Sequence, residues 1–438
     1  MKKGNPKLRV SGGVVVLLAH LFPFAGIADD EFDAPPIEYG KAVPNNAVSR
    51  LQAAIDNGTA ALGYEPGIGY VKSLLDAFSI PVESQVLVFS KTSLQIQFIS
   101  PANPRSIYFN DDVYIGRVPG GEVVEISATD PDLGTVFYTL VQERSERPQF
   151  VRQRDMCLQC HGSVLTGGVP GHIVRSVFTA ADGYPILKAG SFVTTQASPW
   201  EERWGGWYVT GQHGNMRHMG NVIATETERD ATVNMEAGAN RLTLDNRTVL
   251  EEQLVPHSDI VALLVLEHQT RMHNLLTEAN FQTRIALARQ AEVDKILNRD
   301  PAALSETTQH IIKGIGDRLV DYMVFAGEAP MASPVSGTSG FADVFARLGP
   351  RDAEGRSLRD FDLQTRLFKF PLSYLIYSQQ FDALPDAMKD YVYARLWGVL
   401  TGVVFSKNHV HLGPDTRKAI REIVVQTKPG LPGYWKET

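Results

Sequence analysis

The residues of this chain best suited to chemistry are consecutive: positions 157–161 read Cys-Leu-Gln-Cys-His. In such a run, two thiols can add across the two vinyl groups of one porphyrin, and the adjacent histidine is held under the iron as an axial ligand. The only two cysteines of the chain both fall in this run. The pattern therefore predicts one covalently attached haem, with Cys157 and Cys160 as its anchors and His161 as the proximal iron ligand.

Two other chemistries share part of this pattern. A Cys-x-x-Cys pair can be a redox disulfide, which needs a thioredoxin-like βαβ context, or half of a structural zinc site, which needs four protein ligands. The sequence shows neither that context nor a second cysteine pair. Phosphate-binding glycine loops, Gly-x-Ser-x-Gly and His-Glu-x-x-His are also absent from it. Covalent haem attachment is the favoured interpretation.

The first 28 residues have the pattern of an export signal. Four basic residues precede an apolar stretch that ends in Gly26-Ile27-Ala28, so we expect a cleavable secretory signal over residues 1–28. His20 and Pro23 interrupt the stretch, and no later segment approaches ~18 uninterrupted apolar residues, so no stable membrane span is expected after cleavage. Because haem is attached to such motifs outside the cytoplasm, we expect a periplasmic location.

Composition sets the class of protein and of partner. The chain is 43% hydrophobic and 21% charged, as is usual for a globular protein, and its net charge of −7 argues against nucleic acid as a partner. At roughly 100–200 residues per domain, the length predicts two or three cores. Most of the chain must therefore do more than surround one haem. Nothing in the sequence specifies an oligomeric state.

The N-terminal half is expected to contain two helices and then a β-meander. Apolar residues recur with helical spacing over residues 47–62 and 70–78. The period then changes to two, and turn signals separate short segments of antiparallel strand type. These strands are expected at residues 85–89, 94–99, 106–109, 113–118, 123–127 and 135–141, and, beyond the motif, at 173–178, 186–188, 191–195 and 206–210.

From about residue 248 the pattern becomes helical. Ser258 is expected to cap a helix that extends to about residue 293. Further helices are expected at residues 307–325, 386–400 and 416–426. The fold class is accordingly α+β, with an antiparallel β-rich haem-bearing part followed by a helical C-terminal half. The expected units are a signal peptide (1–28), an N-terminal helical segment (29–84), a β-rich haem domain (85–247), a long-helix region (248–326), a linker (327–340) and a C-terminal helical region (341–438).

The second axial position of the iron has several candidates. Residues 212–220 crowd two histidines and two methionines between glycines, in a loop that could fold over a haem edge, with His218 and Met219 preferred. The alternative for this loop is a polar surface segment. His172 follows the motif closely, and its short tether makes a position opposite His161 awkward. Arg152, Arg154 and Arg175 could pair with haem propionates or lie on the surface.

His268 is a further candidate, because it lies within the apolar stripe of the long helix. A buried imidazole must have a partner, which is a protein group more often than iron. His273 falls on the opposite, polar face of that helix, and we expect it to be solvated.

Through Cys157, Cys160 and His161 the chain resembles the c-type cytochromes. The resemblance covers only the motif, and in broad layout the chain is similar to large bacterial periplasmic proteins with one such motif. It implies a haem c cofactor and one-electron transfer to a redox partner protein. The alternative is a haem oxidoreductase that acts on peroxide or on a small nitrogen or sulfur species at an open iron position. A sensory module is a third possibility, but no output domain is recognisable.

Overall fold

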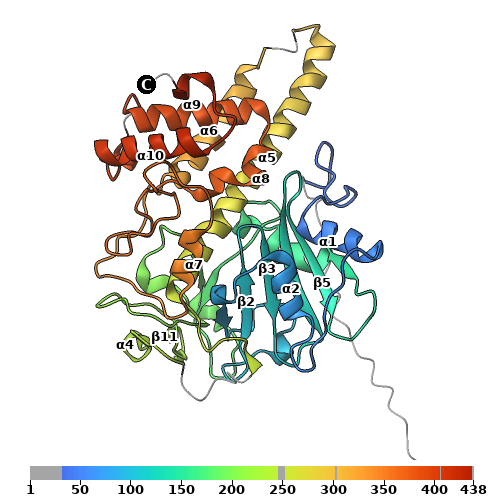
Figure 1. Ribbon diagram of the computed structural model, residues 1–438, viewed down its shortest axis with the longest axis vertical. Helices are drawn as coiled ribbons and strands as arrows, with labels where there is room; N and C mark the ends of the chain where they lie inside the picture. The colour runs from blue at the N-terminus through green and yellow to red at the C-terminus, as the bar shows by residue number, and fades with distance from the viewer. Residues whose placement is uncertain (1–31, 245–251, 301–302, 405, 437–438) are drawn as a thin grey trace, which may run out of the picture.

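The computed structural model describes residues 32–244, 252–300, 303–404 and 406–436. The expected signal peptide lies outside the described residues. The described chain is α+β, as the sequence predicts, with an antiparallel sheet in its N-terminal half and a helical C-terminal half (Figure 1).

Within the described residues, seven strands form the central sheet in the spatial order β6-β5-β4-β3-β2-β1-β9. Every neighbouring pair is antiparallel, and β1 to β6 follow one another in the chain, so this part is the expected meander. The strands are β1 (Val86–Val88), β2 (Arg105–Phe109), β3 (Val113–Arg117), β4 (Val123–Asp130), β5 (Gly134–Val141), β6 (Phe150–Gln153) and β9 (Trp207–Tyr208). Two small hairpins pair β7 (Arg175–Val177) with β8 (Ser191–Val193) and β10 (Thr225–Glu226) with β11 (Ala231–Thr232).

Two expected strands are wrong. Residues 94–99 contain a short 3₁₀ turn instead, because the polar Gln95 points inward, where its side chain donates to the Val123 carbonyl (3.0 Å) and accepts from the Val123 N–H (3.1 Å). Residues 186–188 also enter a 3₁₀ turn, which ends at Gly190 with a positive φ and leaves Leu187 exposed. In both segments local hydrogen bonding outweighs the apolar alternation.

The α-helices of the described residues are α1 (Ala47–Asp56), α2 (Val71–Phe78), α3 (Asp155–His161), α4 (Met235–Gly238), α5 (Ile260–Leu297), α6 (Glu306–Met323), α7 (Phe341–Arg347), α8 (Gln379–Asp382), α9 (Asp386–Thr401) and α10 (Pro414–Thr427). Of these, α1, α2, α5, α6, α9 and α10 lie close to the expected ranges, whereas the sequence did not predict α3, α4, α7 and α8. Helix α1 ends at Asp56, earlier than expected. Asn57 caps it, and the following residue, Gly58, adopts a positive φ.

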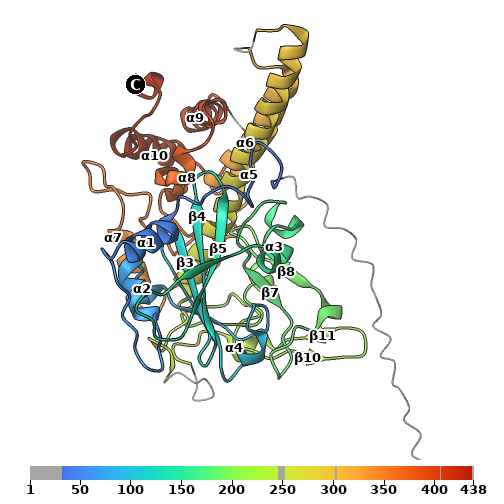
Figure 2. The same ribbon diagram turned by 90° about the vertical axis from the view of Figure 1, so that its right-hand side faces the viewer.

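The sheet has a different partner on each face. On one face, α1 and α2 pack against apolar side chains such as Val124 and Ile126, which alternate along β4 (Figure 1). On the other face, β4 presents Glu125 and Ser127 toward α3 and the segment after it, which lie beside the sheet in Figure 2. A larger apolar cluster joins the N-terminal part of α5 to the helices of the C-terminal half.

Helix α5 organises the molecule, since it runs from the sheet into the helical half and is buried over most of its 38 residues. Its N-cap is Asp259, not Ser258 as expected: one carboxylate oxygen of Asp259 accepts from the Val261 and Ala262 N–H groups at 2.8 and 3.2 Å. Ser258 instead donates to the Tyr208 carbonyl (2.5 Å).

The second oxygen of Asp259 holds residues 327–340, the segment expected as a linker. That oxygen accepts from the Thr338 N–H (2.7 Å) and from the Ser339 N–H (2.8 Å). Met331 and Val335 of the same segment are buried in the larger apolar cluster. The segment therefore packs against the body along its length.

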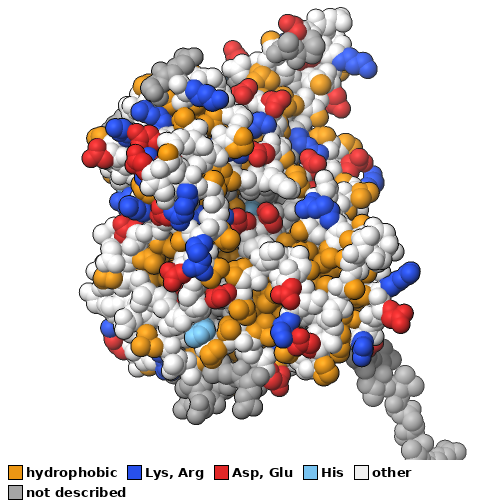
Figure 3. Space-filling model, in the orientation of Figure 1, with side chains coloured by type: hydrophobic (Ala, Val, Ile, Leu, Met, Phe, Trp, Pro, Cys, Tyr) orange, Lys and Arg blue, Asp and Glu red, His pale blue; other side chains and the backbone are white. Residues whose placement is uncertain are grey.

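Charge is distributed without segregation on the face drawn in Figure 3, where basic and acidic side chains are interspersed. Within the described residues, no helix combines the length and the apolarity that a membrane span requires.

Replacing Asp259 should destabilise the fold, because both oxygens of this buried carboxylate accept hydrogen bonds. We expect Asp259→Ala to lower the free energy of unfolding by about 2 kcal/mol or more, through loss of the cap and of the contact with residues 338–339. Urea unfolding of the purified protein measures it. Asp343→Ala removes an exposed carboxylate from the first turn of α7 and should cost less than about 0.5 kcal/mol. Equal costs for the two variants would contradict this role of Asp259.

Candidate functional site

The five residues of the motif lie on α3, a short helix that follows β6 directly. Cys157 and Cys160 are three residues apart on this helix, so their side chains share one face. Both thiols are free; Cys157 is half-buried and Cys160 is exposed. The helix thus presents two unpaired thiols side by side at the surface, as attachment to one flat group requires.

His161 is the last residue of α3, and the two nitrogens of its ring have different surroundings. Its Nδ1 lies 2.8 Å from the Gly171 carbonyl and donates to it, so the lone pair is on Nε2. Burial lowers the pKa of His161, which favours the neutral imidazole. A neutral ring whose Nδ1–H is held by a carbonyl is the usual second shell of a metal-bound histidine.

The carbonyl that orients His161 is itself fixed by α5. Asn274 accepts from the His172 N–H (2.9 Å) and donates to the His172 carbonyl (2.8 Å), which holds the backbone next to Gly171 from both sides. A Cβ atom at Gly171 would lie 2.3 Å from the Asn274 side-chain oxygen, so any other residue there would displace the Asn274 side chain. The orientation of His161 therefore depends on a residue more than a hundred positions away.

The sheet contributes a charged pair that sequence reasoning missed. Arg105 of β2 and Glu125 of β4 form an ion pair (2.9 Å), and both influence the titration of Cys157 and His161 electrostatically. The Nε of Arg105 is buried without a hydrogen-bond partner. An unsatisfied guanidinium N–H near the motif suits a haem propionate. Only strand pairing brings Arg105 here, and no local pattern marks it.

Apolar side chains are exposed around the motif. Met156 lies within α3, and Val164 and Leu165 follow it; Val164 is 88% exposed. Exposed apolar side chains next to two thiols and an iron-ligand type of nitrogen suit a large apolar macrocycle, which would cover them. Together with the His161 geometry and the unpartnered Arg105 N–H, they show that the residues present fit a haem.

The same geometry disfavours a thiol–disulfide centre. Such centres rely on a cysteine whose thiol pKa is lowered, so that the reactive thiolate is populated. Here burial, and secondarily Glu125, raises the pKa of Cys157 to about 11. Among the described residues, no group of three or more His, Cys, Asp or Glu side chains is arranged to hold a metal ion by itself.

The three arginines expected near the propionates have different surroundings. Arg152 donates to the Ala42 and Tyr39 carbonyls at 2.9 and 2.7 Å and anchors the N-terminal segment. Arg154 lies 3.5 Å from Asp33. Arg175 contacts the Ser191 hydroxyl. Of the three, only Arg154 has a carboxylate partner in the described residues; Arg152 is bonded to backbone carbonyls and Arg175 to a hydroxyl.

The loop at residues 212–220 is not a polar surface segment, since its histidines and methionines are buried. The Nδ1 of His218 accepts from the Gly220 N–H (3.0 Å), and its Nε2 is buried without a partner. Met219 accepts from the Ser176 hydroxyl (3.7 Å to sulfur). Both remain predictions as axial ligands; their observed contacts are with Trp204 and with β7 rather than with α3.

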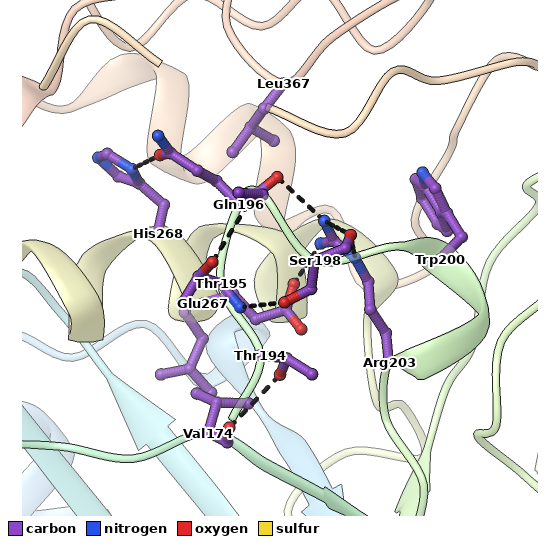
Figure 4. Close-up of polar contacts among 12 residues, drawn as sticks. Val174, Thr194, Thr195, Gln196, Ser198, Trp200, Arg203, Glu267, His268 and Leu367 are labelled. Atoms are coloured by element: carbon purple, nitrogen blue, oxygen red, sulfur yellow. Dashed lines mark hydrogen bonds and ion pairs between the residues drawn. The ribbon is translucent and has the colours of Figure 1, made fainter. Parts of the chain in front are cut away.

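His268 is buried, as expected, and has protein partners on both ring nitrogens. Its Nδ1 lies 2.5 Å from the Gln196 side-chain oxygen and its Nε2 lies 2.8 Å from the Ser373 hydroxyl. Figure 4 shows Gln196 between His268 and Arg203, whose guanidinium pairs with the buried Glu267. To bind iron, His268 would have to give up one of these bonds.

The expectation that His273 is solvated is wrong. Its side chain is fully buried, because the C-terminal region and the sheet close over what would be the polar face of an isolated helix. His172 is also buried, with its ring 4.1 Å from that of Tyr114, and its Nε2 lies 2.9 Å from the Ser127 hydroxyl. Tertiary contacts thus bury two further histidines, His172 and His273.

The two thiols should differ in reactivity in protein made without haem-maturation machinery. At pH 8 only ~0.1% of a thiol with a pKa of about 11 is ionised. Cys157 should therefore react with iodoacetamide at least about tenfold more slowly than Cys160, and its rate should rise with pH up to about 11. Mass spectrometry of the single variants Cys157→Ala and Cys160→Ala measures each rate. Equal rates at pH 8 would refute the buried environment of Cys157.

The chain was compared with protein-family models, with curated proteins and with solved structures, and no match was found in any of the three. What the site does is therefore inferred from its own geometry.

Proposed function

We propose that this chain is a mono-haem c-type cytochrome that transfers electrons to a partner protein in the periplasm. The observation that carries the proposal is the arrangement of His161, whose Nδ1–H is held by the Gly171 carbonyl while Nε2 is left for iron, beside two unpaired thiols on one face of α3. When bound, the haem supplies an iron that alternates between two oxidation states.

The residues around the motif have distinct tasks in this proposal. Cys157 and Cys160 hold the haem through thioether bonds, and His161 binds the iron. Arg105, on the interior strand β2, would pair with a propionate over the sheet face, since its Nε–H has no protein partner. The motif lies at the surface, since Cys160 is exposed, so a partner protein can approach a haem held there.

Covalent attachment is tested by expressing the chain with haem-maturation machinery. We expect a secreted product whose mass exceeds that of the processed polypeptide by one haem, and which retains haem after denaturation. The variant Cys157→Ala/Cys160→Ala should fold, as judged by circular dichroism, and lose haem on denaturation. A wild-type product that is colourless and has the mass of the polypeptide alone would refute the proposal.

The same preparation separates electron transfer from catalysis. Low-spin absorption bands that do not change with cyanide, carbon monoxide or nitrite indicate two strong axial ligands and support an electron carrier. Bands that shift with these ligands indicate an open position and would replace the proposal with its alternative, a haem oxidoreductase.

Because the Gly171 carbonyl orients His161, a methyl group added at residue 171 should affect both the stability of the protein and the iron spectrum. Gly171→Ala should displace Asn274 and lower the free energy of unfolding by about 1–3 kcal/mol. Because the carbonyl at residue 171 moves, the haem should still attach but the iron spectrum should change toward high spin. Gly314→Ala, at an open helical position, is the matched control: it should leave the spectrum unchanged and should raise the free energy of unfolding by about 0.5–1 kcal/mol, since alanine favours a helix over glycine. An unaltered spectrum and stability in Gly171→Ala would contradict this role.

A further inference from the structure

Residues 32–42 contact both ends of α3, and we call this segment the strap. Asp33 of the strap lies 3.5 Å from Arg154, the N-cap residue of the helix. Phe32 is buried, and a Cβ atom at Gly162, the C-cap residue, would lie 3.2 Å from the end of its ring. The strap therefore contacts the helix of the motif immediately before it begins and immediately after it ends.

Helix α3 contributes little to its own stability. None of its seven residues is fully buried, and its N-cap residue makes no side-chain cap bond. Leu158, in the middle of the helix, packs against the apolar cluster to which Phe32 and Tyr39 of the strap belong. A helix this short is not stable alone, so its position depends on tertiary contacts, and the strap supplies several of them.

The strap carries its own backbone hydrogen bonds. Among the described residues, its backbone–backbone bonds all lie within residues 32–42, as from the Tyr39 N–H to the Phe32 carbonyl (2.9 Å). The Gly40 N–H donates to the Asp33 carboxylate (2.6 Å), which closes the segment on itself. Since no strand pairing ties it to the sheet, the strap can move as one unit without breaking the sheet.

Side chains attach the strap to the rest of the molecule. Arg152 donates to two strap carbonyls, and Arg284 of α5 donates to the Pro36 carbonyl (2.9 Å). The Tyr39 hydroxyl donates to the Thr135 carbonyl of β5 (2.8 Å). A segment held by a few side-chain bonds opens at a lower free energy than a strand within the sheet.

The two thiols of α3 are not equally accessible while the strap is in place. Attachment to one haem requires that both sulfur atoms reach the same flat group. Cys160 is exposed, whereas Cys157 is half-buried. The helix must therefore shift to present Cys157, and the contacts of the strap at the two helix ends resist that shift.

We propose, on the basis of the proposed function, that the strap opens locally while the sheet stays folded, so that both thiols reach the haem, and then closes to hold α3 in place. In the open state each S–H adds across one vinyl C=C of the haem. The sulfur bonds to one carbon and the hydrogen to the other, so no oxidant is consumed and no group leaves.

The test is hydrogen exchange, measured by mass spectrometry on the peptide that covers residues 155–162 of the haem-free protein. Phe32→Ala should accelerate exchange in this peptide at least about tenfold. Phe78→Ala, which removes a phenylalanine of the same apolar cluster from α2, should change it less than about twofold. Urea unfolding establishes that both variants are folded. Equal acceleration in the two variants would mean that α3 opens only when the whole protein unfolds, and would overturn the proposal.

A milder pair covers the case in which the alanine variants do not fold. Phe32→Leu should accelerate exchange in the same peptide at least about threefold, and Phe78→Leu should not. Alkylation gives a second readout: in the Phe32 variants Cys157 should react faster with iodoacetamide than in the wild type, while the exposed Cys160 keeps its rate. An unchanged Cys157 rate would contradict the opening of the strap.

The haem-loaded protein separates this inference from the proposed function. Because attachment uses the open state, Phe32→Ala should carry as much haem as the wild type after maturation. A loaded wild type with an unloaded Phe32→Ala would refute the opening step alone, as would equal exchange in the two alanine variants. Absence of haem from the matured wild type would refute the proposed function and, with it, the role of the strap in loading.

Discussion

The hydrogen bonds of the polar side chains buried along α5 hold the structure together. An unsatisfied buried donor or acceptor costs about 1–3 kcal/mol, so most buried polar residues of the helix are bonded to a specific neighbour; the Thr283 hydroxyl is an exception. Glu267 binds Arg203, His268 binds Gln196 and Ser373, and Asn274 binds both sides of the His172 backbone. These bonds join α5 to segments far apart in the chain and place those segments with little freedom.

The bonds made by α5 also position the Cys157–His161 motif, although most of them lie away from it. A seven-residue helix such as α3 is too short to be stable alone, and its side chains would be poorly oriented by local forces. Besides the strap, two tertiary supports fix it. The Gly171 carbonyl, held in place by Asn274, orients His161, and the sheet face with Arg105 and Glu125 lies beside the thiols. Such support holds the side chains of the motif in one geometry.

Buried charge is concentrated in two places along α5. The Arg203–Glu267 pair is almost inaccessible, and removal of either partner would leave an uncompensated charge worth about 3–5 kcal/mol. The second concentration surrounds His273, where Asp111 pairs with Arg359 and the Asp111 carbonyl lies 2.9 Å from the His273 Nε2.

The sequence by itself determined the α+β class and the order of most elements, and it predicts the residues that would anchor a haem. Those features depend on local signals: the period of apolar residues, the turn residues, and a five-residue motif whose chemistry is contained in its own spacing. The N-cap of α5 was missed by one residue because Ser258 and Asp259 are both good caps, and contacts with Tyr208 decide between them.

Tertiary structure alone decided which distant groups support that motif. Arg105 and Asn274 lie on a strand and a helix with no mark of function in their neighbourhoods, and only strand pairing and helix packing bring them to α3 and residue 171. His273 was assigned to solvent because helical periodicity describes an isolated helix, whereas here two sides are covered. Periodicity reports which face is apolar; burial of the polar face is set by partners that lie elsewhere in the chain.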